Sequence, residues 1–360
     1  MIICSSLCAN YIPKAIVLAE SIKRLDPKST TCFCLVEKEF PQDLPQNSAV
    51  DFWVLSKDLG FKNFGRYIVS HNVMEGSTAI KGMLFKYLFT RFPQKQNFVY
   101  LDPDIVVYSD FEELRRILSQ HEIVLTPHLV SPADYYLELS LLNHGTYNLG
   151  FLGLRRSANA ESFVAWWCDR LDYACYDDMP HGIFTDQKWI DLVPAFFGAY
   201  LLRDPGYNVA TWTMFNRTIT QKGDMLLANG QPVRFIHFSG FEKNTYFWAI
   251  DRWAKTDKAL LTILGKQYEK ILKEHKQETF GNRKWSYDYL DNGEKITPQL
   301  RYAFRQKNFL PMVDPYILSV REIKKNLLPE QRLGFQVLTM AKKAIRGFRQ
   351  VISGKRVIVF

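Results

Sequence analysis

The segment FVYLDPD, at residues 98–104, is typical of a short buried strand that runs directly into two carboxylates. At extended spacing, residues i and i+2 point to the same side of the chain, so Asp102 and Asp104 are predicted to face one ion. Pro103 has no backbone N–H, and regular strand pairing is therefore expected to stop there. Two carboxylates this close repel each other unless a cation lies between them, and hard oxygen ligands suit Mn²⁺ or Mg²⁺. A solvated turn after a strand is the alternative that this motif alone leaves open.

Strand and helix patterns alternate on both sides of this segment. Short apolar runs at 2–4, 31–36, 50–55, 105–108, 123–126 and 147–154 predict strands, and helical apolar spacing marks 15–22, 79–92 and 160–171. We expect residues 105–108 to continue the strand at 98–101 in the same register. The alternation predicts an α/β fold with a largely parallel sheet, in which ligands bind beyond the carboxyl ends of the strands. The loop after the first strand lacks GxGxxG and GxxxxGK[ST] patterns, which disfavours NAD-binding and P-loop proteins.

A second strand-to-loop segment, RFIHFSGFEK, lies at residues 234–243. A neutral imidazole at His237 can complete the coordination of an ion that the aspartate pair holds. Gly240 would let the backbone approach a diphosphate, and Lys243 would neutralise its charge. A histidine that serves only the structure of the strand is the alternative.

Taken together, Asp-x-Asp and the later His-x-x-Gly-x-x-Lys resemble the GT-A glycosyltransferases related to glycosyltransferase family 8. The resemblance covers roughly residues 1–245 and implies a Rossmann-like nucleotide-sugar-binding domain. It also implies that Asp102, Asp104 and His237 bind Mn²⁺ and that Lys243 contacts the donor diphosphate.

Further segments match this family in order. Asn10 and Tyr11 resemble its uridine-binding pair, with the tyrosine ring against the base, and Lys81 lies where the family commonly carries a basic residue near the donor. Asn148, in the run YNLG, resembles the Asn of the family's Asn-x-Gly segment, which lies near the transferred sugar. Asp186 and Gln187 resemble the family's Asp-Gln pair, which faces the sugar and the reaction centre. A turn residue is the alternative for Asn148, and an N-cap of the following helix is the alternative for Asp186.

Two positions depart from the family pattern. Cys8 and Ala9 stand where an acidic residue often touches the base or ribose, so recognition of the nucleotide base is less firmly implied than recognition of the diphosphate. Asn244 and Thr245 replace a Pro-Trp pair that commonly follows the lysine, which implies a different closing loop.

The resemblance implies sugar transfer from a nucleotide diphosphate sugar, with a UDP-sugar expected, to a glycan or lipid-linked acceptor. It implies retention of anomeric configuration, and because no Asp or Glu stands out as a nucleophile, front-face attack is favoured. The runs at 186–194 and 206–209 resemble a bacterial subgroup associated with surface-polysaccharide biosynthesis. A nucleotidyltransferase and a non-catalytic carbohydrate-binding protein on the same fold remain the alternatives.

The pattern changes after about residue 255, so we predict a catalytic domain at 1–255 and a mainly helical region at 256–360. Lys and Arg concentrate in residues 301–360, whereas the rest of the chain is close to neutral, which argues against nucleic-acid binding. The apolar residues Leu338, Ala341, Ile345, Phe348 and Ile352 form one stripe of a basic helix. This helix either lies on an anionic membrane surface or packs on the catalytic domain.

The cysteine pattern and the hydropathy bear on the compartment. The six cysteines form no CxxC pair, so we expect buried free thiols and no zinc site. The sequence shows neither a secretory signal nor an apolar run long enough to span a membrane. We therefore expect a cytoplasmic protein that associates peripherally with the inner face of the membrane through its basic tail.

Overall fold

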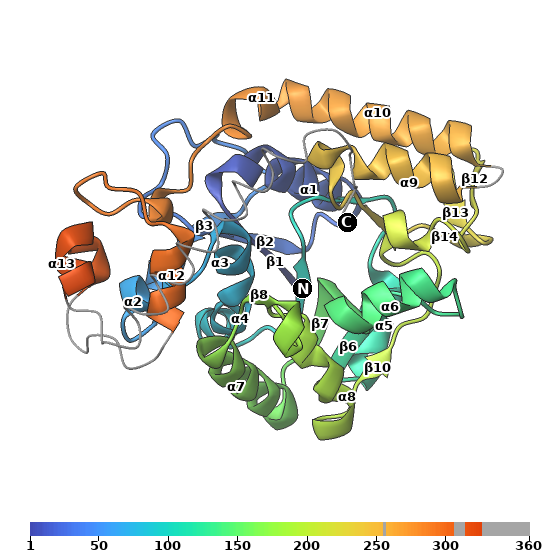
Figure 1. The fold of residues 1–360 in the computed structure, drawn as a ribbon. Helices are drawn as coiled ribbons and strands as arrows, with labels where there is room; N and C mark the ends of the chain where they lie inside the picture. Colours follow the sequence, from blue (N-terminus) through green and yellow to red (C-terminus); the bar gives the residue numbers. More distant parts are fainter. Residues whose placement is uncertain (255–256, 306–313, 326–360) are drawn as a thin grey trace. The chain divides into compact units, whose positions relative to one another are not determined.

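The computed structural model describes residues 1–254, 257–305 and 314–325 (Figure 1). The contacts divide the chain into two compact units, Met1–Phe61 with Met74–Trp285, and Lys62–Val73 with Ser286–Phe360. The predicted division into 1–255 and 256–360 stays a prediction, because compactness does not say which residues a function needs.

A seven-stranded sheet forms the centre of the first unit, in the order β10-β6-β7-β4-β1-β2-β3. Strand β7 is antiparallel to both of its neighbours, and the other pairings are parallel. The predicted α/β fold with a largely parallel sheet is therefore confirmed. The strands are β1 (Ile2–Leu7), β2 (Thr30–Leu35), β3 (Phe52–Leu55), β4 (Asn97–Leu101), β6 (Ile123–Pro127), β7 (Tyr147–Arg155) and β10 (Tyr200–Leu201).

Helices cover both faces of this sheet. On one face, Val99 of β4 belongs to a buried cluster with Ile16 of α1 and Leu118 of α5. The preceding residue, Phe98, points the other way and packs edge-to-face on Phe89 of α4, with ring centroids 4.8 Å apart. Helix α7 packs against α4 (Figure 1). The bounds of these helices are α1 (Ile12–Leu25), α4 (Lys81–Arg91), α5 (Glu112–Gln120) and α7 (Ala158–Tyr173).

A smaller sheet, ordered β11-β15-β5, begins immediately after the aspartate pair. Its strands are β5 (Ile105–Val107), β11 (Val209–Ala210) and β15 (Phe235–His237). The prediction that residues 105–108 continue the preceding strand in register is wrong, because β5 leaves the large sheet and pairs antiparallel with β15. The reason is the turn at Pro103, where the Ile105 N–H donates to the Asp102 carbonyl at 3.2 Å and redirects the chain.

The later part of the first unit is helical, as predicted, with α9 (Thr245–Trp253), α10 (Lys258–Glu274) and α11 (Gln277–Phe280). Helices α10 and α11 pack against α1 (Figure 1). The remaining elements in or adjoining this unit are α3 (Val73–Ala79), α6 (Tyr135–His144), α8 (Val193–Phe196), β8 (Asp177–Asp178), β9 (Ile183–Phe184), β12 (Ile219–Lys222), β13 (Met225–Ala228) and β14 (Gln231–Pro232).

The second unit contains α2 (Phe64–Ile68), α12 (Pro298–Arg305) and α13 (Val320–Lys325). Buried Arg301 ties it together by donating to the Val69 and Tyr287 carbonyls at 3.0 and 2.9 Å. Within the described ranges, the helices are too short or too polar to cross a membrane. The predicted basic stripe at 338–352 lies outside the described residues.

Candidate functional site

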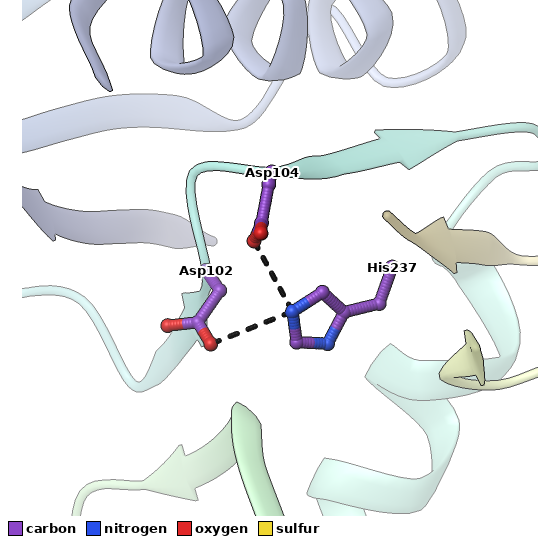
Figure 2. Close-up of side chains that lie close together, drawn as sticks. All are labelled: Asp102, Asp104 and His237. Carbon is purple, nitrogen blue, oxygen red and sulfur yellow. Dashed lines mark ion pairs between the residues drawn. The ribbon is translucent and has the colours of Figure 1, made fainter. Parts of the chain in front are cut away.

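Three potential metal ligands converge at the junction of the two sheets. Asp102 follows β4, Asp104 precedes β5, and His237 ends β15. One ligand atom from each side chain lies within 4.8 Å of the other two. The Nε2 atom of His237 is 3.1 Å from Asp104 Oδ1 and 3.7 Å from Asp102 Oδ2 (Figure 2). Segments far apart in the sequence thus meet where the sequence predicts that they should.

Backbone pairing fixes this convergence. His237 pairs with Ile105 across β15 and β5, and the Phe238 N–H donates to the Asp104 carbonyl at 2.9 Å. The Asp102 N–H donates to the Gly150 carbonyl at 2.9 Å, which brings β7 against the same turn. A Cβ atom on Gly150 would lie 2.5 Å from Cε1 of His237, so only glycine leaves room for the imidazole.

The electrostatics of the group suit a cation. Burial alone would raise the pKa of Asp104, but the charge and hydrogen bond of His237 outweigh it and lower that pKa to about 2. For His237, burial lowers the pKa, and the two carboxylates reverse this effect and raise it. The two carboxylates thus favour positive charge at His237, as they would favour a cation beside it. Two carboxylates and an imidazole in a mostly buried niche could hold a divalent metal ion.

Lys81 lies beside this group and is itself buried. Its Nζ is 3.0 Å from Asp186 Oδ2 and 3.5 Å from Asp102 Oδ1, and it donates to the Leu149 carbonyl at 2.9 Å. Burial lowers the pKa of Lys81, but the two carboxylates outweigh burial and raise it, so the ammonium stays charged. Asp186 does not cap the following 3-10 helix, whose N-cap is Gln187, and the N-cap alternative is therefore wrong.

Asn148 and Gln187 lie in one buried hydrogen-bond network. Gln187 accepts from the Leu149 N–H at 2.9 Å and donates to the His144 carbonyl at 3.0 Å. Asn148 Nδ2 is 3.2 Å from Nε2 of His128. Burial lowers the pKa of His128 to about 3, so this imidazole is neutral. Sequence reasoning gave His128 no role, although it follows the carboxyl end of β6, where site residues gather.

The predicted base-binding pair begins the loop after β1. Asn10 and Tyr11 end the 3-10 turn Ala9–Tyr11, and both are half-buried. The Lys14 ammonium lies 3.8 Å from the centroid of the Tyr11 ring. Lys14 is fully buried and forms an ion pair with Glu242. Sequence reasoning missed Lys14; its only local signal is its position three residues after Tyr11.

Glu242 belongs to the loop that carries two predicted diphosphate contacts. Gly240 has a φ of 70°, a left-handed conformation that glycine adopts freely. Lys243 ends the 3-10 turn Phe241–Lys243 and is exposed. The loop is thus anchored to α1 through Glu242 and Lys14, while Lys243 remains accessible.

The acidic residue that the family often has just before its Asn-Tyr pair is missing here, but a carboxylate from the segment after β2 lies close to that position. Glu37 follows β2, is buried, and accepts from the Ala9 N–H at 2.9 Å. An acidic group therefore lies beside Ala9, the residue before Asn10, although Cys8 and Ala9 occupy the positions where the family often has one. The signal that could have found Glu37 is its place at the carboxyl end of a parallel strand.

One family model and two curated proteins match parts of this chain. The model of glycosyl transferase family 8 matches residues 2–152. The uncharacterized protein YfnF of Bacillus subtilis strain 168 is 23% identical over 252 residues, which cover 66% of this chain and 80% of YfnF. YfnD of the same organism is 25% identical over 167 residues, 45% of this chain, and the match spans about half of YfnD, 52%.

Two solved glycosyltransferases are similar at low identity. Galactosyltransferase LgtC, in complex with donor and acceptor sugar analogues, is 12% identical with a TM-score of 0.46, and the match covers 76% of this chain and 96% of LgtC. GlyE of Streptococcus pneumoniae TIGR4 is 13% identical with a TM-score of 0.43, over 79% of this chain and 65% of GlyE. The family match includes Asp102, Asp104 and Asn148 and ends before His237. The chain therefore resembles glycosyl transferase family 8 over residues 2–152, and this resemblance supports glycosyl transfer.

Proposed function

We propose that this protein transfers a sugar from a nucleotide diphosphate sugar, a UDP-sugar in the first instance, to a glycan or lipid-linked acceptor. The observation that carries the proposal is the convergence of Asp102, Asp104 and His237 beside the buried Lys81–Asp186 pair. This cluster lies at the carboxyl end of β4, where ligands bind in sheets of this kind. The match to family 8 covers the segment with Asp102 and Asp104.

A divalent ion, Mn²⁺ or Mg²⁺, would be held by Asp102, Asp104 and His237. It would stabilise the negative charge that develops on the departing nucleotide diphosphate. Lys243 is exposed on the loop next to His237 and can add a second positive charge to the diphosphate. Gly240 would let the backbone of this loop approach the phosphates.

The donor's other groups have partners on the same edge of the sheet. We assign the base to Tyr11, whose half-buried ring can stack on it, and to Asn10 beside it. We assign the sugar to Asn148, Asp186 and Gln187, which are buried, and Lys81 links Asp186 to Asp102 of the metal group. These contacts would hold the anomeric carbon in place for the acceptor hydroxyl.

Retention by front-face attack is the stereochemical course we propose. Asp186 is the one carboxylate among the residues that we assign to the sugar. Its Oδ2 is only 3.0 Å from the Lys81 ammonium, and its side chain is almost fully buried. A carboxylate held in this way is poorly suited to attack carbon, which supports direct transfer without an aspartyl intermediate.

We further propose that residues 1–255 form the catalytic domain and that the basic tail holds the protein on an anionic membrane surface at the cytoplasmic face. This arrangement would place the site beside a lipid-linked acceptor. The excess of Lys and Arg in residues 301–360 supports it.

A donor panel distinguishes the three candidate functions. The full chain is incubated with Mn²⁺ and a set of nucleotide sugars, and nucleoside diphosphate is quantified. Glycosyl transfer predicts release of the diphosphate from one donor, increased by the correct acceptor. In a parallel incubation with a nucleoside triphosphate and a sugar phosphate as substrates, a nucleotidyltransferase would instead release pyrophosphate. Carbohydrate binding without release from any donor would favour a non-catalytic protein.

A further inference from the structure

Asn208 joins the metal group to the buried amide network, although sequence reasoning gave it no role. It lies directly before β11 and is 1% exposed. Its Oδ1 atom is 3.3 Å from Nδ1 of His237. Its Nδ2 atom donates to Asn148 Oδ1 at 2.9 Å and to Thr126 Oγ1 at 3.0 Å. One side chain thus touches three strands.

The backbone around Asn208 is held in an uncommon conformation. Asn208 has a φ of 54°, in the left-handed region that asparagine tolerates better than most residues. The buried guanidinium of Arg217 donates to the Tyr207 carbonyl at 2.6 Å and to the Asn208 carbonyl at 3.3 Å. Such a conformation persists when its surroundings fix it, and it aims the amide between His237 and Asn148.

The network determines which way the Asn208 amide points. The Gly150 N–H, which can only donate, lies 3.1 Å from the Asn148 side-chain oxygen. That oxygen is therefore an acceptor, and the Asn208 atom facing it must be the donor Nδ2. The other amide atom, Oδ1, is left to face His237. Turning the amide over would place its oxygen against that acceptor and lose this hydrogen bond.

This orientation fixes the tautomer of a neutral His237. An amide oxygen can only accept, so Nδ1 of His237 must carry the proton. The lone pair then lies on Nε2, the atom nearest Asp102 and Asp104 (Figure 2). A hydrogen bond of this kind orients a ligating imidazole and makes it a better ligand.

We infer that Asn208 is a positioning residue that presents Nε2 of His237 to a divalent ion and couples this ion to Asn148, the residue assigned to the donor sugar. The coupling to the sugar rests on the proposed function. The presentation of His237 to the ion does not, and it can be tested without any nucleotide sugar.

The experiment measures Mn²⁺ affinity by titration calorimetry on the full chain, without nucleotide, for two substitutions. Asn208→Gly removes the side chain, and glycine adopts the left-handed backbone without strain. Asn208→Asp keeps an oxygen facing His237 but cannot donate to Asn148. We expect Asn208→Gly to weaken Mn²⁺ binding by about 10- to 100-fold, as loss of an outer partner of a metal ligand does. We expect Asn208→Asp to stay within about threefold of wild type.

Thr126→Val is the matched control, because it removes the other acceptor of Asn208 Nδ2 and leaves the contact with His237. It should bind Mn²⁺ like wild type, and thermal unfolding in EDTA compares the folds of all variants. Wild-type affinity in Asn208→Gly would overturn the inference. Equal losses in the Gly and Asp variants would also overturn it, because they would indicate a general structural role.

The position of the proton on His237 can be measured on the wild-type chain, so this test does not depend on the folding of any variant. With Mg²⁺ bound, long-range ¹H–¹⁵N correlation spectra should show the His237 proton on Nδ1. A proton on Nε2 would contradict the inference.

Donor kinetics test the coupling between the ion and Asn148 alone. Asn208→Asp should lower kcat for nucleoside diphosphate release at saturating Mn²⁺. If the Mn²⁺ affinities of the variants change as expected but the chain releases no diphosphate, the proposed function is rejected. The inference that Asn208 presents His237 to the ion would then still stand.

Discussion

Lys81 and Asp186 form an almost fully buried ion pair, with Nζ 3.0 Å from Oδ2. The same ammonium lies 3.5 Å from Asp102 Oδ1, so a residue assigned to the sugar and a residue assigned to the metal share one counter-charge. Sequence reasoning assigned Lys81 directly to the donor. The structure shows that its ammonium faces these two carboxylates.

Removing this counter-charge should destabilise the protein. Lys81→Met keeps most of the apolar stem but leaves Asp186 buried and unpaired, so we expect the free energy of unfolding at neutral pH to fall by about 3–5 kcal/mol. Urea denaturation monitored by fluorescence measures this change. Adding Asp186→Asn should recover part of the loss, because it removes the unpaired charge. A Lys81→Met protein as stable as wild type would show that the pair does not contribute as described.

Tyr11 and Lys243 should differ in their kinetic effects. Tyr11→Ala removes the proposed stacking surface and should raise KM for the donor more than it lowers kcat, whereas Tyr11→Phe should retain most of the affinity. Lys243→Ala should mainly lower kcat, by about 10-fold or more, because its charge matters most as the diphosphate departs. Steady-state kinetics with varied donor separate the two. A change confined to KM in Lys243→Ala would refute its assignment.

Mn²⁺ affinity should rise with pH. The pKa of His237 is raised above its ordinary value of about 6.5, so near neutral pH a proton competes with the metal for Nε2. Asp104, with a pKa lowered to about 2, stays ionised throughout and contributes no slope. Calorimetric titrations between about pH 6 and 8 should show tightening until the histidine is neutral. A dissociation constant that does not change with pH would contradict this account.

In the metal-free protein, the raised pKa of His237 gives a stability contribution that falls as pH rises, which is the opposite trend to that of Mn²⁺ affinity. Because the folded pKa of His237 is raised, its ion pair with Asp104 stabilises the fold fully below the unfolded pKa. This contribution is lost as pH rises through the folded value. In EDTA, the stability difference between wild type and His237→Gln should therefore shrink as pH increases. A difference that grows with pH would be inconsistent with the raised pKa.

The basic tail should confer binding to anionic membranes. Sedimentation with anionic and neutral liposomes compares the full chain with a version that ends at Pro329. The full chain should bind anionic vesicles in a salt-dependent way, at about 1 kcal/mol per basic residue near the surface, and the shortened version should not. Equal binding by both, or by neither, would exclude the tail as an anchor. Loss of folding in the shortened chain would favour packing on the catalytic domain.

Local patterns allowed much of the fold and of the metal group to be predicted. The FVYL run before Asp102 and the RFI run before His237 each give a strand and its carboxyl end, and both are local properties of the sequence. The α/β class followed from the alternation of such segments with helices. The Asp–Asp–His convergence then followed from the rule that ligands gather at strand ends and from the family resemblance.

The rest depends on contacts that no local pattern encodes. The transfer of β5 to a second sheet required knowing that β15 would pair with it. The roles of Glu37 and Lys14 arise from neighbours that are distant along the chain, and each alone is typical of an ordinary surface residue. Asn208 follows a Gly-Tyr pair typical of a turn, and only the three-dimensional network shows the partners of its side chain.

The release of UDP from a UDP-sugar by the full chain, measured with and without a divalent ion, tests the central claim most directly. Asp104→Asn is the matched variant, since it keeps the size of the side chain and removes the charge beside His237. The account predicts release with Mn²⁺, its abolition by EDTA, its restoration by excess Mn²⁺, and a loss of at least about 100-fold in Asp104→Asn with the fold intact. Release at the full rate in EDTA, or by Asp104→Asn, would contradict it.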